Sequence, residues 1–329
     1  MPTSVALARC TTYRDEDVDA ALARALDALG GWSAVIRPGA RVLLKPNLIA
    51  AAPPDEHATT HPALVAGVVR AVLACGGRPS IGDDPAFGSV RGIANACGLA
   101  DVARRYHVPL VELAAPRQLS TTTRLTPRGL VIDRTAAETD VLINLPKLKA
   151  HNQLLFTCAV KNLYGCVPGK RKVWRHVRAR HDLARFADML IANARALAPK
   201  LSVVDGVIAM EGRGPRRGTP KRLGVIVAGT DCVAVDRIVC ELIGCDPARS
   251  AILQAAQRAG FGETDATRIT LVGDLLAELR APTFRLPDAL DDISFDVGRA
   301  LKSVVRQFWM TRVTERACAA EAPALPYGH

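Results

Sequence analysis

Aromatic residues are scarce in this sequence: Phe, Trp and Tyr together make up 4% of its 329 residues. Hydrophobic residues still account for 49%, so Ala, Val, Leu and Ile must supply most of a core. Such aliphatic side chains suit parallel strands that are covered by helices. The composition therefore predicts an α/β protein with a mostly parallel sheet flanked by helices, and the length favours two interlocked lobes.

The cysteine spacing lacks the common metal and cluster motifs. None of the nine cysteines forms a C-x-x-C pair, and their spacing matches no ferredoxin or zinc-ribbon pattern. Because several of them lie in apolar segments, the pattern favours buried free thiols in a reducing cytosol. Residues 1–17 contain no signal-peptide pattern, and no apolar run reaches the roughly 18 residues of a membrane helix. We expect a cytoplasmic protein without a membrane partner.

Several catalytic motifs are also missing. No glycine-rich loop ends in G-K-[ST], and no G-x-G-x-x-G follows the first predicted strand, so Walker-type and dinucleotide binding lack support. A serine-hydrolase elbow, an H-E-x-x-H helix and the zinc motif of deaminases are absent as well. Hydrolysis through a nucleophilic serine and zinc-dependent deamination therefore lose most of their support.

Positive charge is in excess, with a net charge of +11 and a pI near 9.5. Arginine is spread along the whole chain, so the excess alone is not a nucleic-acid signature. Seven Lys and Arg residues do concentrate in 170–185. A solvated helix face and a surface for phosphate or carboxylate groups are the two leading interpretations of that segment. Nucleic-acid binding is the least favoured, because Trp174 is the only interleaved aromatic residue.

Strand and helix patterns alternate along the chain, which predicts βαβ units. Strands are expected at 41–44, 79–82, 109–112, 131–133, 141–145, 201–205, 223–228 and 269–272, and helices at 15–30, 62–75, 182–196, 232–243, 250–259 and 297–309. Residues 1–280 are expected to form the α/β domain, with two sublobes split near 145–200. Residues 281–329 are expected to form a C-terminal helix and a frayed tail.

Polar side chains gather where the predicted strands end, which is the edge at which ligands bind in open α/β sheets. A lysine that leaves a buried strand must keep its ammonium in water or beside an anion. We therefore expect an anionic small molecule to be held by a set of cations, amides, a hydroxyl and glycine-loop amides. These residues are Lys45, Asn47, Thr60, Lys147, Lys149, Asn162, Gly212 and Gly214. For Asn47 a turn around Pro46, and for Thr60 a helix cap, are equally weighted alternatives.

Three residues in the segment 147–176 are candidates for catalysis. His151 and His176 are placed to act as general acids or metal ligands, and Lys161 lies between them among glycine turns. A solvated loop is the alternative for this segment. The carboxylates Asp83, Asp205 and Glu211 follow strands and are the residues that a divalent metal would use.

These clusters together resemble the family called domain of unknown function 362. The matching pieces, in order along the chain, are KPNL at 45–48, TTHP at 59–62, GDDP at 82–85, PKLKAH at 146–151, AVKNLYG at 159–165 and DGVIAMEGRGP at 205–215. Each piece is short, but the ordered set is specific and covers roughly residues 40–275.

The resemblance implies a cytoplasmic α/β protein, and many family members carry a ferredoxin-like module with two [4Fe-4S] clusters after this domain. This sequence departs from that pattern: it has a lone Cys318 where the module would begin. We therefore expect no 4Fe-4S cluster in this chain, and a redox reaction would need a separate redox partner. The leading hypothesis is an enzyme acting on an anionic small molecule. The alternative is a non-catalytic carrier of a metal or a phosphorylated cofactor.

Overall fold

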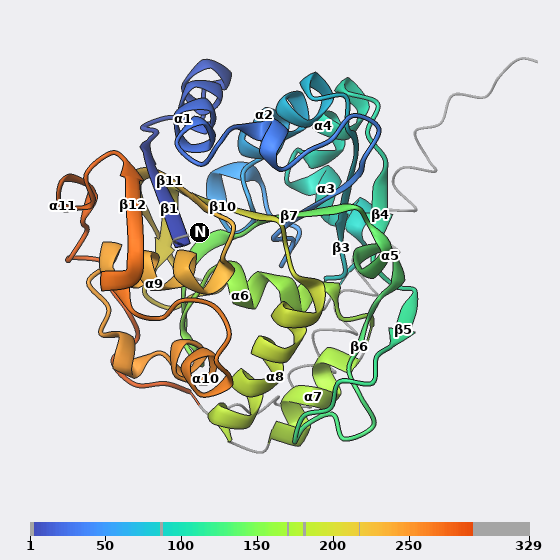
Figure 1. Ribbon diagram of the computed structural model, residues 1–329, viewed down its shortest axis with the longest axis vertical. Coiled ribbons are helices and arrows are strands. Elements are labelled where there is room, and N and C mark those ends of the chain that lie inside the picture. The colour runs from blue at the N-terminus through green and yellow to red at the C-terminus, as the bar shows by residue number, and fades with distance from the viewer. Residues whose placement is uncertain (1–2, 86–87, 170, 180–181, 217, 292–329) are drawn as a thin grey trace, which may run out of the picture.

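The fold is built on one mixed sheet of ten strands (Figure 1). The computed structural model describes residues 3–85, 88–169, 171–179, 182–216 and 218–291. Eight strands follow the order β12-β1-β11-β10-β7-β2-β3-β4, and β8 and β9 extend the sheet beside β10. Six of the nine strand pairs are parallel, and β11 is antiparallel to both of its neighbours. The predicted α/β fold with a mostly parallel sheet is confirmed.

The strands of the large sheet are β1 (Thr3–Arg9), β2 (Arg41–Pro46), β3 (Arg78–Asp83), β4 (Leu110–Glu112), β7 (Val141–Leu145), β8 (Lys147–His151), β9 (Leu155–Thr157), β10 (Leu201–Glu211), β11 (Thr219–Gly229) and β12 (Ile269–Gly273). A separate antiparallel pair is formed by β5 (Pro116–Gln118) and β6 (Val131–Asp133).

The α-helices are α1 (Asp15–Asp27), α2 (Pro62–Ala74), α3 (Val90–Ala96), α4 (Leu99–Arg105), α5 (Arg134–Glu138), α6 (Ala159–Asn162), α7 (Arg171–Ala179), α8 (Leu183–Leu197), α9 (Cys232–Leu242), α10 (Ala251–Ala259) and α11 (Leu276–Leu279). Short 3₁₀ helices are η1 (Trp32–Ala34), η2 (Pro54–Glu56), η3 (Leu163–Cys166), η4 (Pro247–Arg249) and η5 (Ala266–Arg268).

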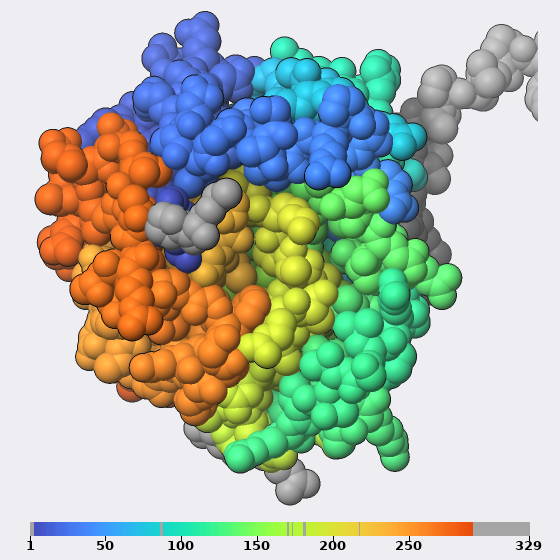
Figure 2. All heavy atoms as spheres, in the orientation of Figure 1, coloured from blue at the N-terminus to red at the C-terminus, as the bar shows by residue number. Residues whose placement is uncertain are grey.

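Two apolar layers cover the two faces of the sheet, because strand side chains alternate between the faces. One layer packs under α1 to α4, and the other packs under α6 and α8 to α10. Figure 1 shows these two helix groups on opposite sides of the sheet. In the space-filling view α1 and α2 cover the upper edge of the molecule, and the segment with β5 and β6 forms its lower right (Figure 2). The sheet contains strands from both sides of the predicted boundary near 145–200.

Most predicted elements coincide with observed ones within a few residues. All eight expected strands are present, although 131–133 pairs with β5 outside the large sheet. Two segments differ from what the sequence indicates. Residues 147–151, for which a solvated loop is the alternative interpretation, form β8, and the strand expected at 201–205 continues to Glu211. Pairing with β10 and β11, which is a long-range contact, overrides the turn-forming residues there.

The predicted C-terminal helix at 297–309 and the tail lie outside the described residues. Within the part that the structure describes, no helix combines the length and the apolarity that are needed to cross a membrane. The eight cysteines of this part are all free, and seven of them are buried. The buried thiols agree with the interpretation of the cysteine pattern.

Candidate functional site

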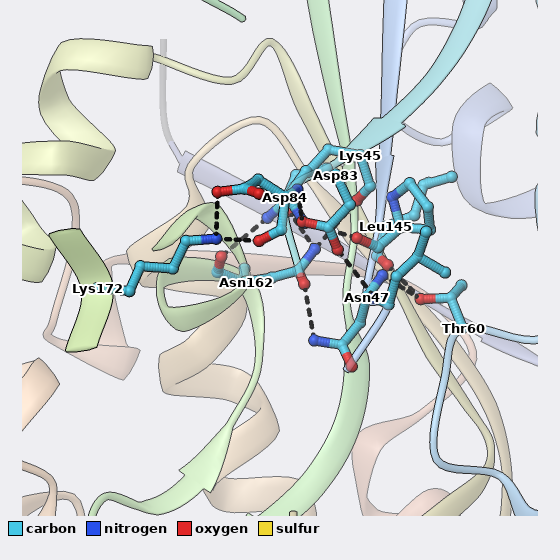
Figure 3. Close-up of polar contacts among 12 residues, drawn as sticks. Lys45, Asn47, Thr60, Asp83, Asp84, Leu145, Asn162 and Lys172 are labelled. Atoms are coloured by element: carbon cyan, nitrogen blue, oxygen red, sulfur yellow. Dashed lines mark hydrogen bonds and ion pairs between the residues drawn. The ribbon is translucent and has the colours of Figure 1, made fainter. Parts of the chain in front are cut away.

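The candidate site lies at the carboxyl ends of β2, β3 and β7 and along the adjoining β8–β10 pair, where three buried lysines meet three aspartates. Lys45, near the end of β2, is 1% exposed, and its Nζ lies 2.9 Å from Oδ1 of Asp83 at the end of β3. The same carboxylate accepts hydrogen bonds from the backbone N–H groups of Leu48 and Asp84. Figure 3 shows this pair at the centre of the polar cluster. The parallel register of β2 and β3 brings the two residues together.

Gly165 covers the Lys45–Asp83 pair without any side chain. A Cβ atom at this position would lie 2.6 Å from Nζ of Lys45 and would also collide with the Asp83 carboxylate. The backbone carbonyl of Gly165 accepts a hydrogen bond from the Asp84 N–H. Glycine is required here because the backbone approaches a buried ion pair closely.

A second buried pair joins Lys147 to Asp205, 2.9 Å apart, and both side chains are fully buried. The hydroxyl of Tyr13 donates to Asp205 and the His61 N–H donates to the other carboxylate oxygen. Burial alone would raise the pKa of Asp205, but Lys147 and these hydrogen bonds outweigh it, so the pKa lies below the usual value. The Tyr13 ring stacks on His61 with centroids 3.6 Å apart.

The third pair joins the site to α7. Nζ of Lys172 lies 2.9 Å from Oδ2 of Asp84, and the same oxygen accepts from the Gly169 N–H at 2.5 Å. Lys172 also donates to the Asp84 carbonyl. These contacts tie the start of α7 to the loop that follows β3 (Figure 3).

A chain of amides connects the strand ends. Asn47 Nδ2 donates to Asn162 Oδ1, and Asn162 Nδ2 donates to Asn144 Oδ1 and to the Lys45 carbonyl. The Thr60 hydroxyl donates to the Leu145 carbonyl and accepts from the Asn47 N–H. Asn47 and Thr60 thus connect the strand ends and loops that form the site. In particular, Thr60 does not cap α2, because the side chain of His61 accepts from the Ala63 N–H instead.

Lys149 is fully buried, yet no carboxylate pairs with it among the described residues. Its Nζ donates to Asn47 Oδ1 at 2.6 Å and to the Ala58 carbonyl at 2.8 Å. Burial, together with the charges of Lys147 and Lys161, lowers the pKa of Lys149 well below its ordinary value. Two neutral acceptors compensate an ammonium less well than a carboxylate does.

Lys161 is the second lysine without a carboxylate in the described part of the chain. It is half-buried, and its Nζ lies 5.0 Å above the ring of Tyr164. Burial, reinforced by the charges of Lys172 and Lys45, lowers the pKa of Lys161 to about 8. At pH 7 an ammonium with a pKa of about 8 is about one-tenth deprotonated and remains mostly charged.

The helix α6 that carries Lys161 and Asn162 is held by a buried carboxylate. Asp236 of α9 accepts hydrogen bonds from the N–H groups of Ala159, at 2.6 Å, and Val160, at 3.2 Å. Burial raises the pKa of Asp236 to about 7 in spite of these donors. Asp236 therefore positions the short helix.

Both candidate histidines lie within electrostatic range of Lys161. Burial and then the charge of Lys161 lower the pKa of His151 well below its usual value, and they lower that of His176 to about 4. His151 Nδ1 accepts from the Gln153 N–H, and His176 Nδ1 lies 2.8 Å from the Lys172 carbonyl oxygen. The structure thus brings both imidazoles near Lys161 and keeps them neutral at neutral pH.

The three carboxylates predicted as metal ligands are not brought together. Asp83 and Asp205 pair with different lysines, and Glu211 accepts from the side-chain Nε and the backbone N–H of Arg285. No group of three His, Cys, Asp or Glu side chains in the described ranges could hold a metal ion. The residues present do not fit a shared divalent metal.

The glycines predicted to bind an oxyanion have other roles. The Gly212 N–H donates to the Arg285 carbonyl, and the Gly214 N–H donates to the Gly212 carbonyl. A Cβ on Gly214 would collide with the carbonyl of Ala150 in β8. Both amides are therefore engaged within the chain, and Gly214 serves close packing against β8.

Three further residues of the site are not among the predicted site residues. Tyr13 precedes α1, Asn144 lies inside an apolar strand, and Asp236 lies inside a helix. For Asn144 and Asp236, a polar residue in an otherwise apolar run was the available signal, because such groups need a buried partner. For Tyr13 the signal was weaker: it is one of only four tyrosines in the chain.

The charges of the site do not balance. Among the described residues, the site contains five lysines and three aspartates. The lysines are Lys45, Lys147, Lys149, Lys161 and Lys172, and the aspartates are Asp83, Asp84 and Asp205. The two unmatched lysines are Lys149 and Lys161. A surplus of buried and half-buried cations is the electrostatic environment that an anionic group would stabilise.

The sequence profile of the domain of unknown function called DUF362 matches residues 42–241, which carry all of these lysines. The chain belongs to the DUF362 family. It is also 39% identical over 315 residues to the thylakoid-associated protein sll1697 of Synechocystis sp. (strain ATCC 27184 / PCC 6803 / Kazusa), covering 96% of this chain and 97% of that one.

Two solved structures align with part of this DUF362 chain. The lactate racemase apoprotein of Thermoanaerobacterium thermosaccharolyticum aligns with 74% of this chain at 12% identity and a TM-score of 0.49. A protein from Thermotoga maritima aligns with 70% of it at 14% identity and a TM-score of 0.42. The alignments span 57% and 58% of those two chains, which is less than two thirds of each.

The raised pKa of Asp236 predicts a specific pH dependence of stability. From pH 4 to pH 7, roughly, the folded protein keeps a proton that the unfolded chain has released, so this contribution to stability is lost as the pH rises. Asp236→Asn cannot titrate at this position. The free energy of unfolding of this variant, measured with urea, should therefore fall less than that of the wild type from about pH 4 to about pH 7. Asp27→Asn, at an exposed position, is the control and should follow the wild type. Parallel curves for wild type and Asp236→Asn would contradict the assignment.

Proposed function

We propose that this DUF362 protein is an enzyme that acts on an anionic small molecule bound beside Lys149 and Lys161. The observation that carries the proposal is that Lys149 in β8 and Lys161 in α6 have no carboxylate partner among the described residues. A carboxylate or phosphate group placed there would supply the missing negative charge. The ligand edge of an open α/β sheet is the expected position for such a site.

Lys161 is the residue best suited to move a proton in this reaction. Its pKa of about 8 lies close to neutral pH, so it can bind an anion as an ammonium and also exchange a proton with it. His151 and His176 are neutral at the same pH and would act as hydrogen-bonding partners of the substrate. The ion pairs of Lys45 and Lys147 with their aspartates would hold the surrounding strands and loops in place.

The proposal also covers the source of electrons for a redox reaction and the location of the protein in the cell. A redox version of the reaction would draw its electrons from a separate partner, because the sequence lacks the cysteine spacing of a cluster. We propose a cytoplasmic location. The name of the relative describes that protein as thylakoid-associated, so a membrane surface is the alternative that fractionation of cells would test.

Native mass spectrometry of protein purified without oxygen, together with metal analysis, identifies the ligand class. The proposal predicts a co-purifying anion, or binding of an added anion from a panel that includes citrate and inorganic phosphate. Turnover of the bound molecule distinguishes an enzyme from a carrier.

Lys161→Ala should weaken anion binding by about ten- to a hundredfold, since a charge-assisted hydrogen bond contributes about 1.5–3 kcal/mol. Isothermal titration calorimetry with the best anion of the panel measures this loss, and thermal unfolding checks that the fold survives. Lys200→Ala removes an exposed lysine and is the matched control. Unchanged affinity in Lys161→Ala would remove the residue from the site.

Anion affinity should fall as the pH rises from about 7 to about 9, because the Lys161 ammonium loses its proton through its pKa of about 8. Lys161→Arg should bind with little change over the same range, since a guanidinium keeps its charge. Calorimetric titrations at several pH values make the comparison. An equally steep fall in Lys161→Arg would assign the titration to another group.

A further inference from the structure

The helix α7 divides the basic segment 170–185 between two environments. Lys172 is buried against Asp84 at the candidate site, whereas Arg171, Trp174 and Arg178 are exposed on another side of the helix. Trp174 is 66% exposed. In the described part of the chain, the segment is therefore neither one solvated face nor one continuous basic surface.

A cavity of about 450 Å³ lies between this second side of α7 and the segment that leads into β6. Figure 1 shows α7 and β6 next to each other at the lower right of the molecule. Four arginines line the cavity, Arg128, Arg171, Arg175 and Arg178, and Trp174 and Thr126 are among its other lining residues. None of its described lining residues is acidic.

Arg175 is the decisive residue of this cavity. Its side chain lies in the wall although the residue is only 6% exposed. Its Nη2 reaches the Val131 carbonyl oxygen at 3.4 Å, and its Nη1 is buried without a hydrogen-bond partner among the described residues. Buried guanidinium groups are normally paired with an anion, because an unpaired one loses its hydration without compensation.

We propose that this cavity, here called the α7 pocket, binds the phosphate group of a small phosphate ester whose planar ring stacks on Trp174. Four guanidinium groups offer the forked donors that phosphate oxygens accept best. The cavity volume exceeds what a phosphate alone occupies, which leaves room for the rest of the ester. The exposed indole offers an aromatic face for a ring.

The α7 pocket is independent of the anion site at the strand ends. Lys172 and His176 of the same helix belong to that site, whereas the arginines of the pocket do not. Phosphate-ester binding should therefore survive Lys161→Ala, so that failure of one proposal leaves the other open to its own test. Occupancy of the pocket would also hold in place the helix that carries Lys172.

Adenosine monophosphate and inorganic phosphate are the probes, titrated into the full-length protein by calorimetry and by tryptophan fluorescence. Arg175→Gln and the double variant Arg171→Gln/Arg178→Gln should each weaken binding of adenosine monophosphate by about tenfold or more. The double variant changes only exposed positions and keeps the test valid if Arg175→Gln fails to fold. Arg91→Gln removes an exposed arginine elsewhere and should bind like the wild type.

Trp174→Phe and Trp174→Ala test the ring. Alanine should weaken binding of adenosine monophosphate several-fold more than phenylalanine does, and neither should affect inorganic phosphate. The proposal is overturned by unchanged affinity in the arginine variants or by a wild type that binds neither probe at low salt. Binding restricted to RNA or to vesicles of anionic phospholipid would overturn it as well.

Discussion

The burial of lysine ammonium groups at the ends of parallel strands is the constraint on which the rest of this structure depends. An ammonium removed from water costs several kcal/mol unless a partner compensates it. Asp83 and Asp205 provide that compensation for Lys45 and Lys147, and Gly165 must lack a side chain so that the backbone can cover the first pair. The amides, loops and short helix around the site are arranged to satisfy these groups.

The location of the site could be predicted from the sequence, but its pairings could not. Lysines directly after apolar strands, as at Lys45, place charge at the ligand edge of a parallel sheet whatever the details of the topology. Which carboxylate meets which lysine depends on register and on distant segments. Tyr13, for example, reaches Asp205 across 192 positions of the chain. For the same reason Glu211 was expected to join a metal site, whereas the segment after α11 brings Arg285 to it.

Tertiary contacts also override local sequence preferences within the site. The glycines around Glu211 indicate a loop, yet pairing with β11 continues the strand to that residue. The basic residues of 170–185 are contiguous in the sequence, but the helical period places Lys172 on another side of α7 than Arg171 and Arg178. One side of α7 thus belongs to the lysine network, and another side lines a separate arginine-rich cavity.

Among the described residues Lys149 and Lys161 have no carboxylate partner, and we propose that an anion binds beside them. Nuclear magnetic resonance titration of lysines labelled at Cε measures this directly, with Lys161→Arg used to assign the Lys161 signal. We expect Lys161 to titrate at about 8 and Lys149 well below 10.5, and a bound anion such as citrate to raise both pKa values. Titration of both lysines at their ordinary 10.5, with no response to added anions, would contradict it.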